Sequence, residues 1–516
     1  MAVFSASATS RRAFLTRGAA LVVVSTALPL LAACGGATNT ASSASPAVAA
    51  TTSSAPAAGS ATATGTTATQ LVGTTSAAPA SQATGQKAQG SVTWLVPEDP
   101  LLDKFSRTGI VPDFKKVQPD INLQVVSPGS TAYGEKLLAL VAAGTTPEVF
   151  TDWGNIGVYT LQSHQIVSSI STYFKQAKID LNYLLPEYVA EYSANGELFA
   201  VPWNSNPNFI VYNKTLFQKD NVPLPPTDWG DKSWTTEKLL TAAQALTHAT
   251  GDPATASFGL IVGEGSVGSL GWLWNADPFN NTGGPEASPV YQGQRLTTAY
   301  PDRQGMVDAM TWRSDLLLKH KVSPTPTDVK GLASTGNPIF SGRVGMAEVA
   351  GGWLERQAAV AKPHFDWGIA PMPYGLGGKN TSQREDNAWY VGKGSKNPDG
   401  GFQLILFASR GTGADDLITY AQDNPPLSDT SYFTKWSKSV LAIPGLSMPA
   451  ADFQAVFEGG IKSGFPDPTN VINNATAFSS AFNQLLAPVW AGTQTAQTAL
   501  QAVKARWQGV IQTMAQ

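Results

Sequence analysis

The chain has 516 residues, of which 34 are basic and 37 acidic, and its formal net charge at pH 7 is −3. A chain of this length usually exceeds what one hydrophobic core serves, so we expect two lobes. Nucleic-acid binders normally show a basic excess or a basic stripe, and this sequence has neither. Several of the 14 tryptophans and 13 tyrosines lie in polar loops, where core residues are not expected.

The N-terminus has the features of an export signal. Residues 10–15, Ser-Arg-Arg-Ala-Phe-Leu, match the twin-arginine pattern, and the apolar stretch 19–31 that follows is too short for a membrane span. It runs into Leu-Ala-Ala-Cys, which resembles a lipoprotein processing box, and Cys34 is the only cysteine of the chain. We predict a signal peptide over 1–33 and lipidation of Cys34. The alternative is a chance cysteine behind an ordinary signal peptide.

Residues 34–90 are predicted to be a disordered tether. From position 35 on they contain no aromatic residue and one charge, Lys87, among Ala, Thr, Ser, Gly and Pro. Such a composition has almost nothing to bury, so it should not fold. A flexible chain of this length has an end-to-end distance of roughly 40 Å. It would hold a folded part away from a membrane surface.

The first folded segment reads as alternating strands and helices. We predict strands over 91–96, 121–126 and 147–153 and a helix over 133–143, with a further helix after residue 100 that breaks near Pro112. This order predicts a mainly parallel sheet with helices on both faces. Ligands of such sheets bind beyond the carboxyl ends of strands. These positions hold Trp94, Glu98, Asp99, Asp152 and Trp153.

A connecting stretch follows over 196–217. A strand should end at Pro202, because proline has no N–H to donate to a sheet. A polar loop then carries Trp203 and Asn204, and the apolar run 209–212 leads into a helix near residue 213. The stretch resembles the Gly-x-x-x-x-Val-Pro … Tyr-Asn-Lys-x-Leu-Phe segment of bacterial extracellular solute-binding proteins of the sugar (maltose-type) class. In that family it crosses between the lobes beside the ligand. The alternative is a plain strand–loop–strand connection.

Four later segments resemble the same family, in the expected order. Residues 340–353 resemble its Phe-x-x-Gly-x-x-Ala-Met-x-x-x-Gly-x-Trp segment, with Met and Ala exchanged, and in the family this tryptophan, here Trp353, stacks on the ligand. Residues 365–373 resemble the strand after it, 388–398 a second crossing with its Ser-Lys-Asn turn, and 495–500 a threonine-capped helix near the end. The resemblance covers 91 to about 516.

The resemblance implies an α/β, two-lobed, periplasmic-binding-protein-like fold of type II. Each lobe would be a mainly parallel sheet flanked by helices, and hinge crossings would join the two. We expect lobe 1 to hold 91–204 and about 341–390, and lobe 2 to hold 205–340 and about 391–516. Within lobe 2 we predict a helix over 236–249, a strand over 256–262 and a loop over 271–275, whose Trp272 and Trp274 are candidates for core or site.

A search for catalytic chemistry finds little. The four histidines are isolated, and no Gly-x-Ser-x-Gly elbow is present. Residues 263–268 match Gly-x-Gly-x-x-Gly but lead into no clear helix, so we interpret them as a flexible turn. Carboxylates are plentiful, yet nothing singles out a glycosidase pair. We therefore expect no enzyme, no metal and no cofactor.

The expected function is reversible capture of a mono- or oligosaccharide between the lobes. Flat C–H patches of a sugar lie on aromatic faces, and its hydroxyls need fixed polar partners. Each lobe would hold half of the contacts, so binding would shift an open–closed equilibrium. The candidate ligand-binding residues lie in loops or at strand ends, and they are Trp94, Glu98, Asp99, Tyr133, Asp152, Trp153, Trp203, Asn204, Trp272, Trp274 and Trp353.

The family resemblance also implies partners and a location. It implies delivery of the ligand to the transmembrane subunits of an ABC permease, by a monomer lipid-anchored through Cys34 to the outer face of the cell membrane. Two alternatives remain open. One is a solute-binding protein for a peptide, polyamine or organic acid, which an arginine cluster or several carboxylates in the cleft would favour. The other is a secreted polysaccharide-active enzyme, which a hydrolysis assay would identify.

Overall fold

The structure is a computed structural model, and it describes residues 88–129, 133–153, 156–250, 255–263, 265–333 and 337–514, without the side chains of Gly352 and Trp353. The predicted signal peptide, Cys34 and almost all of the predicted tether lie outside these residues. Residues 79–516 form one compact unit. None of the helices in the described residues combines the length and the apolar character that a membrane span needs.

Lobe 1 is built on a five-stranded sheet with the order β2-β1-β3-β12-β6. β1 runs parallel to β2 and β3, whereas β12 lies antiparallel between β3 and β6. The sheet is therefore mixed, and the parallel prediction holds only for its first three strands. The strands are β1 (Gly90–Leu95), β2 (Ile121–Val126), β3 (Val149–Thr151), β6 (Ala200–Pro202) and β12 (Ala388–Val391).

Helices cover both faces of this sheet. The predicted break near Pro112 is absent, because α1 (Pro100–Lys104), a π-helical turn η1 (Phe105–Ile110) and α2 (Val111–Val117) follow one another without a gap. The π-turn lengthens the hydrogen-bond spacing just before the proline, which has no N–H to contribute. The other helices and the small hairpin of lobe 1 are α3 (Tyr133–Ala142), α4 (Val158–Ser163), α5 (Ser171–Ala177), η3 (Leu181–Tyr183), α6 (Pro186–Glu191), β4 (Ser193–Ala194), β5 (Glu197–Leu198), α12 (Pro398–Ala408), α13 (Thr412–Asp416) and η9 (Leu417–Ala421).

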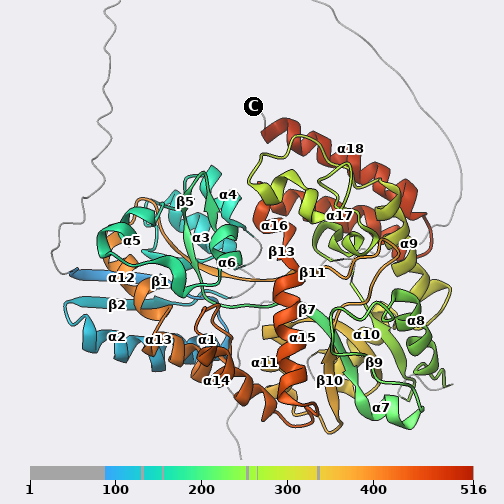
Figure 1. Ribbon diagram of the computed structural model, residues 1–516. Helices are drawn as coiled ribbons and strands as arrows, with labels where there is room; N and C mark the ends of the chain where they lie inside the picture. The colour runs from blue at the N-terminus through green and yellow to red at the C-terminus, as the bar shows by residue number, and fades with distance from the viewer. Residues whose placement is uncertain are drawn as a thin grey trace, which may run out of the picture. The chain divides into compact units, whose positions relative to one another are not determined.

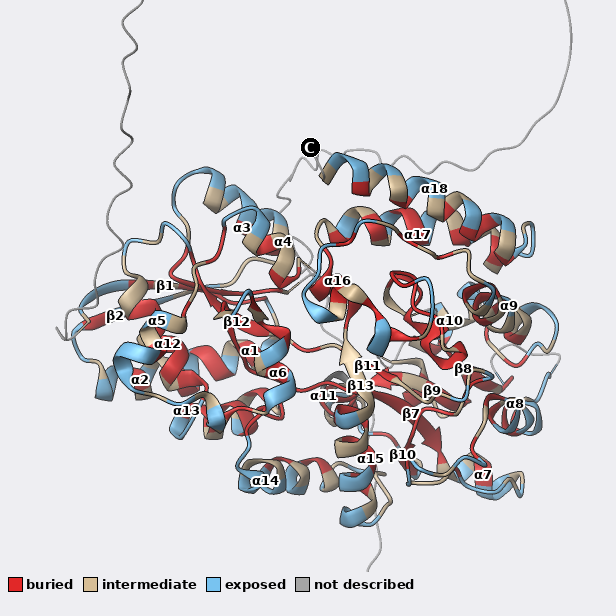
Figure 2. Ribbon diagram, turned by 45° about the horizontal axis from the view of Figure 1, so that its top comes forward, coloured by how far each residue is buried: buried red, intermediate tan, exposed pale blue. Residues whose placement is uncertain are grey.

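Lobe 2 is built on a four-stranded sheet with the order β10-β7-β9-β8, of which Figure 1 labels β7, β9 and β10. β7 is buried along its whole length (Figure 2). Its side chains alternate between two cores, with Ile210 and Tyr212 on one face and Phe209 and Val211 on the other. The strands are β7 (Asn208–Asn213), β8 (Phe258–Ile261), β9 (Val344–Ala350) and β10 (Trp367–Ala370).

Helices of lobe 2 pack on both faces of its sheet, and α17 and α18 lie side by side next to α9 (Figure 1). As predicted, the side chain of Thr495 accepts a hydrogen bond from the Thr498 N–H at the start of α18. The helices of this lobe and the short β11–β13 pair are α7 (Lys214–Lys219), α8 (Thr236–Ala245), η4 (Ser266–Trp274), η5 (Pro285–Ala287), η6 (Pro289–Gln292), α9 (Gln304–Leu318), α10 (Pro326–Leu332), η8 (Pro338–Ser341), α11 (Gly351–Ala361), β11 (Ser382–Arg384), α14 (Thr430–Leu441), α15 (Ala450–Ser463), β13 (Gly464–Pro466), α16 (Pro468–Val471), α17 (Ala475–Trp490) and α18 (Ala496–Met514).

The chain crosses between the two sheets over 203–207, 385–387 and 422–429. The expected division of the later chain differs from this arrangement. β9 and β10 pair with β7 in lobe 2, although 341–390 were assigned to lobe 1. β12 lies in the sheet of lobe 1, and α12, α13 and η9 also pack in lobe 1, although about 391–516 were expected in lobe 2. The reason is that residues 340–353 complete the second sheet by pairing with β7 and β8, which a local pattern does not reveal.

Candidate functional site

The carboxyl ends of parallel strands mark one edge of each sheet. In lobe 2, β8 and β9 run parallel, so the chain after Ile261 and the start of α11 leave from the same edge. β7 is antiparallel to β9, so the crossing 203–207 also arrives there. In lobe 1, the ends of β1 and β3 lead into 96–99 and 152–153. Sheets of this kind bind ligands beyond such ends.

Polar side chains gather at this edge of lobe 2, next to the crossings. We define the polar floor as Asn206, Asn208, Ser266, Glu348, Gln383, Glu385 and Asp467. Asn208 Nδ2 lies 3.5 Å from Glu348 Oε1, and Asn206 Nδ2 donates to the backbone carbonyl of Glu385 at 2.9 Å. The crossings and the end of β9 are thereby linked through amide side chains.

Gln383 organises the other half of the polar floor. Its Nε2 donates to Asp467 Oδ2 at 3.1 Å, to Ser266 Oγ at 3.3 Å and to Glu385 Oε1 at 3.4 Å. Its Oε1 accepts hydrogen bonds from the N–H of Ser266 and from the hydroxyl of Ser269. One glutamine therefore connects the start of η4, the second crossing and the segment after β13.

Two acceptors on the polar floor have no partner among the described residues. They are Asn206 Oδ1 and Asn208 Oδ1, although these residues are only 2% and 6% exposed. Buried polar atoms are normally hydrogen-bonded, and leaving one unpaired costs about 1–3 kcal/mol. Two neighbouring unpaired amide oxygens at strand ends are typical of a site that awaits donors from a ligand.

The electrostatics of the polar floor are acidic. Burial, and then the charges of Asp467 and Glu348, raise the pKa of Glu385 to about 7. Burial also raises the pKa of Asp467, against hydrogen bonds from Thr469 and Ser266 that lower it. Burial and neighbouring acidic charge thus both oppose ionisation of Glu385.

A buried ion network supports the polar floor from behind. Arg384 follows Gln383 on β11, so its side chain points to the opposite face. There it donates to Glu191 at 3.1 Å and to Asp386 at 3.0 Å, with all three side chains almost fully buried. Arg384 therefore fixes the second crossing to α6 and does not neutralise the polar floor.

Two predicted tryptophans of lobe 1 lie in its core. Trp94 is 2% exposed and packs edge-on against Phe105 and Trp389. Trp203 stacks on Trp389, with ring centroids 5.8 Å apart, and its indole N–H donates to Thr151. Neither ring leaves a face for a ligand, so we remove both from the candidate site. The positions of these two tryptophans in the sequence suggested exposed rings. In the structure, rings from four segments pack against one another and bury both indoles.

Three predicted polar residues of lobe 1 have structural partners. The Tyr133 hydroxyl donates to the Leu95 carbonyl at 3.1 Å and accepts from the Thr151 N–H at 3.0 Å, which joins β1 to β3. Asp152 accepts from the Ala388 N–H at 2.9 Å and the Tyr390 hydroxyl at 3.1 Å, and burial raises its pKa to about 6. Asn204 Oδ1 accepts from the Asn387 N–H at 2.8 Å. These contacts hold the sheet and crossings together, and all three side chains are buried with their partners, so these residues also leave the candidate site.

The predicted loop 271–275 is helical and buried. Residues 266–274 form the 3₁₀ helix η4, with a kink at Val267 and Gly268. Trp272 is 1% exposed and packs against Tyr291 and Phe465, whereas Trp274 is 7% exposed and packs against Trp312. Both indoles are core residues. The glycines at 268 and 271 read as loop formers, but they let Met306 of α9 approach closely.

Four predicted residues stay at the strand ends. Glu98 is exposed and Asp99 is half-buried after β1, and Trp153 is half-buried after β3. Trp353 lies in the first turn of α11, directly beyond β9, and its side chain lies outside the described set. These positions lie directly after the carboxyl ends of β1, β3 and β9.

Sequence reasoning named none of the residues of the polar floor as candidates. A signal was present for Glu348, which is the only charged residue in the otherwise apolar run 344–350. The asparagines at 204, 206 and 208 also alternate as residues on one side of an extended chain do. For Ser266, Gln383 and Asp467 no local signal exists, since they meet only through the β11–β13 pair.

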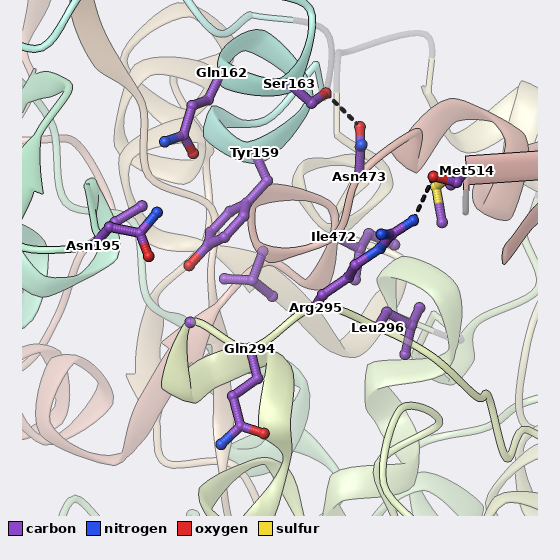
Figure 3. Close-up of a pocket in the computed structure, with 13 residues that line it drawn as sticks. Tyr159, Gln162, Ser163, Asn195, Gln294, Arg295, Leu296, Ile472, Asn473 and Met514 are labelled. Carbon is purple, nitrogen blue, oxygen red and sulfur yellow. Dashed lines mark hydrogen bonds between the residues drawn. The ribbon is translucent and has the colours of Figure 1, made fainter. Parts of the chain in front are cut away.

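A second opening lies between α4 and the C-terminal part of lobe 2. One cavity of about 520 Å³ is lined by Tyr159, Gln162, Asn195 and Gln294, among others (Figure 3). A neighbouring cavity of about 600 Å³ shares Tyr159 and Asn195. Ser163 donates to Asn473 across it at 2.9 Å. None of the described residues that line either cavity has a buried unpartnered polar atom, so the polar floor is the stronger site.

Comparisons with known proteins agree with this architecture. An ABC substrate-binding protein of Listeria monocytogenes, solved in complex with cycloalternan, is 18% identical, with a TM-score of 0.67 over 83% of this chain and 99% of that chain. A solute-binding protein from Thermotoga lettingae bound with alpha-D-tagatose is 17% identical (TM-score 0.62; 82% and 100% covered). Maltose-bound MalE3 of T. maritima is 18% identical (TM-score 0.61; 82% and 99% covered). These likenesses confirm the two-lobed α/β fold.

A curated relative matches a shorter stretch. The "Multiple sugar-binding protein" of Streptococcus mutans is 28% identical over 127 residues, which are 23% of this chain and 27% of that protein. The match thus spans about a quarter of the relative's length. The model of the family described as "Bacterial extracellular solute-binding protein" matches residues 104–415, more than half of the chain. The chain therefore belongs to the family of bacterial extracellular solute-binding proteins.

Proposed function

We propose that the protein captures a carbohydrate reversibly between its lobes and delivers it to an ABC importer. The observation that carries this proposal is the pair of unpartnered amide oxygens, on Asn206 and Asn208, beside the strand ends of both lobes. Sugar hydroxyls are donors of the kind that these acceptors need. The matching proteins named above include one named for sugar binding and others solved with tagatose, maltose or cycloalternan.

The proposed site joins the polar floor to four residues at strand ends. Glu98, Asp99 and Trp153 would come from lobe 1, and Trp353 from lobe 2. An indole from each lobe would cover the two C–H faces of a sugar ring, whose slightly positive hydrogens are attracted to the aromatic quadrupole. Because the contacts are divided between lobes, binding would favour the closed state. This role is binding and not catalysis.

The function is tested by binding. A thermal-shift screen against mono- and oligosaccharides should raise the melting temperature with at least one ligand, since a ligand that binds only the folded state stabilises it. Titration calorimetry of the Trp353→Ala variant should then show about tenfold weaker affinity or worse, with an unchanged circular dichroism spectrum. Trp490→Ala is the matched control, because that indole lies on α17 beneath Arg313. Normal binding by Trp353→Ala would remove it from the site.

We also propose export by the twin-arginine route and a lipid anchor at Cys34, in a monomer that meets its permease at the outer face of the cell membrane. The motifs at 10–15 and 31–34 support this proposal. Radiolabelled palmitate should be incorporated into the wild-type protein and not into Cys34→Ala. Release of wild-type protein and variant in equal amounts into the medium would contradict the anchor.

A further inference from the structure

The polar floor brings three carboxyl groups from three segments together. Glu348 lies near the end of β9, Glu385 on the crossing after β11, and Asp467 after β13. Asn208 Nδ2 lies 3.5 Å from Glu348 Oε1, and Gln383 Nε2 links Glu385 to Asp467 at 3.4 and 3.1 Å. Among the described residues, no three His, Cys, Asp or Glu side chains are placed to hold a metal ion together.

Positive charge is missing where it would be expected. In the described part of the chain, neither Glu385 nor Asp467 takes part in an ion pair. The basic side chain nearest in sequence, Arg384, is committed to Glu191 and Asp386 on the opposite face of β11. The donors that reach Asp467 are the neutral groups of Gln383, Ser266 and Thr469. Uncompensated carboxylates in a partly desolvated site are costly.

Two of the three acids keep surface exposed to solvent. Glu348 and Glu385 are half-buried, so each keeps some exposed surface. The amide oxygens of Asn206 and Asn208 stand beside them without a partner. The two unpaired atoms on the polar floor are therefore both acceptors, and the ionisable groups beside them are acids. Organic acids and phosphorylated sugars would be repelled, and a neutral sugar would satisfy the acceptors without offsetting the charge.

We infer that the ligand is an amino sugar, or an oligosaccharide containing one, whose ammonium group binds at Glu385 between Glu348 and Asp467. This inference rests on the proposed function and names the ligand class of the same site. An ammonium group has three N–H donors and no acceptor, which matches the acids. The neighbouring hydroxyls would donate to the amide oxygens of Asn206 and Asn208. Charge-assisted hydrogen bonds of this kind are about twice as strong as neutral ones.

Binding should be linked to proton release. The groups around Glu385 are Asp467, Glu348 and Asp386, all acidic, together with Asn208. Burial and then these acidic charges raise the pKa of Glu385 to about 7. An ammonium group favours the ionised carboxylate, so it lowers this pKa and expels the proton when it binds near pH 7. A neutral sugar leaves the proton in place.

The test uses sets of three ligands, and the members of each set share one sugar skeleton. D-glucosamine, D-glucose and N-acetyl-D-glucosamine, and the β-1,4-linked oligomers of each, are titrated calorimetrically at pH 6.5 in two buffers of different ionisation enthalpy. We expect the amino form to bind at least about tenfold more tightly than both neutral forms, with proton release for it alone. Equal or tighter binding of a neutral form would overturn this inference and leave the proposed function intact. Binding of spermidine with no binding of any saccharide would overturn both, as would no binding at all.

Two variants test whether the preference for the amino sugar comes from the polar floor. Glu385→Gln should lose affinity for the amino form about tenfold more than for its neutral counterparts, and should bind without releasing a proton. Asp467→Asn is a second test, and it should show a smaller loss of the preference for the amino form. Glu237→Gln on the exposed face of α8 is the matched control and should keep both the preference and the proton release. Circular dichroism checks that each variant is folded. An undiminished preference in folded Glu385→Gln would overturn the assignment.

Discussion

Arg356 of α11 and Asp99 of the loop after β1 form an ion pair that joins lobe 2 to lobe 1. The second guanidinium nitrogen of Arg356 lies 3.4 Å from Asp423, on the third crossing. The side chain of Arg356 is 7% exposed, and those of Asp99 and Asp423 are 17% and 1% exposed. Asp99 also caps α1 by accepting from the N–H groups of Leu101 and Leu102. One arginine therefore holds the strand end of lobe 1 against the helix that carries Trp353.

Breaking this pair should favour separated lobes. Arg356→Met keeps most of the side-chain volume but leaves Asp99 without its partner from lobe 2, so the arrangement described here loses an interlobe contact. We expect ligand affinity to fall about tenfold and the radius of gyration with saturating ligand to rise in small-angle scattering. Arg107→Met, which removes an exposed pair with Asp103 inside lobe 1, is the control and should change neither. Wild-type affinity and scattering in Arg356→Met would refute the role.

Glu355, next to this arginine, should make folding stability fall with rising pH. Neither of its carboxyl oxygens has a partner among the described residues, and burial, followed by the charge of Asp423, raises its pKa well above 4.5. The folded protein therefore keeps a proton that the unfolded chain loses near pH 4.5. Its stabilising effect is present at acid pH and is lost as the pH rises from 4.5 to the higher folded value.

Glu355→Gln removes this dependence. Urea denaturation should show the variant and the wild type to be similar near pH 4, with the variant gaining on the wild type by up to about 1.4 kcal/mol per pH unit above pH 4.5. The gain stops at the folded pKa. A difference in unfolding free energy that stays constant from pH 4 to pH 8 would show that Glu355 ionises normally.

The Tyr133→Phe variant tests whether Tyr133 stabilises the core of lobe 1 or binds the ligand. It removes the hydroxyl that bridges the Leu95 carbonyl and the Thr151 N–H, so both buried backbone groups lose this hydrogen bond. We expect the free energy of unfolding to drop by about 1–3 kcal/mol, while saccharide affinity stays within about twofold. Denaturant titration and calorimetry on the same preparation measure both quantities. Loss of affinity with unchanged stability would return Tyr133 to the site.

The local elements of this protein follow closely from its sequence. The strand ending at Pro202 and the helix capped by Asn213 lie where proline and asparagine chemistry put them. The predicted break near Pro112 is wrong, because a π-turn accommodates the proline within one continuous run. A deviation of this kind depends on the spacing of backbone hydrogen bonds, which residue types do not record.

Side-chain roles were less accessible to sequence reasoning. Trp94, Trp203, Trp272 and Trp274 sit in polar or glycine-rich stretches, yet each is buried by rings or strands distant in sequence. Asp152 and Asn204 look like ligand-binding groups until their backbone partners at Ala388 and Asn387 are known. A buried polar group is satisfied or left unpaired by residues far along the chain, so its role is a tertiary property.

The sequence alone determined the family, the α/β elements and the crossing at 203–207, because turn chemistry, hydrophobic period and motif order are local. The tertiary structure decided which strands share a sheet and which side chains form the polar floor. Glu348, Glu385 and Asp467 come from segments more than a hundred residues apart at the extremes, and only the β9 and β11–β13 pairings bring them together. Charge density at a site depends on distance in space, and distance in space is fixed by strand pairing.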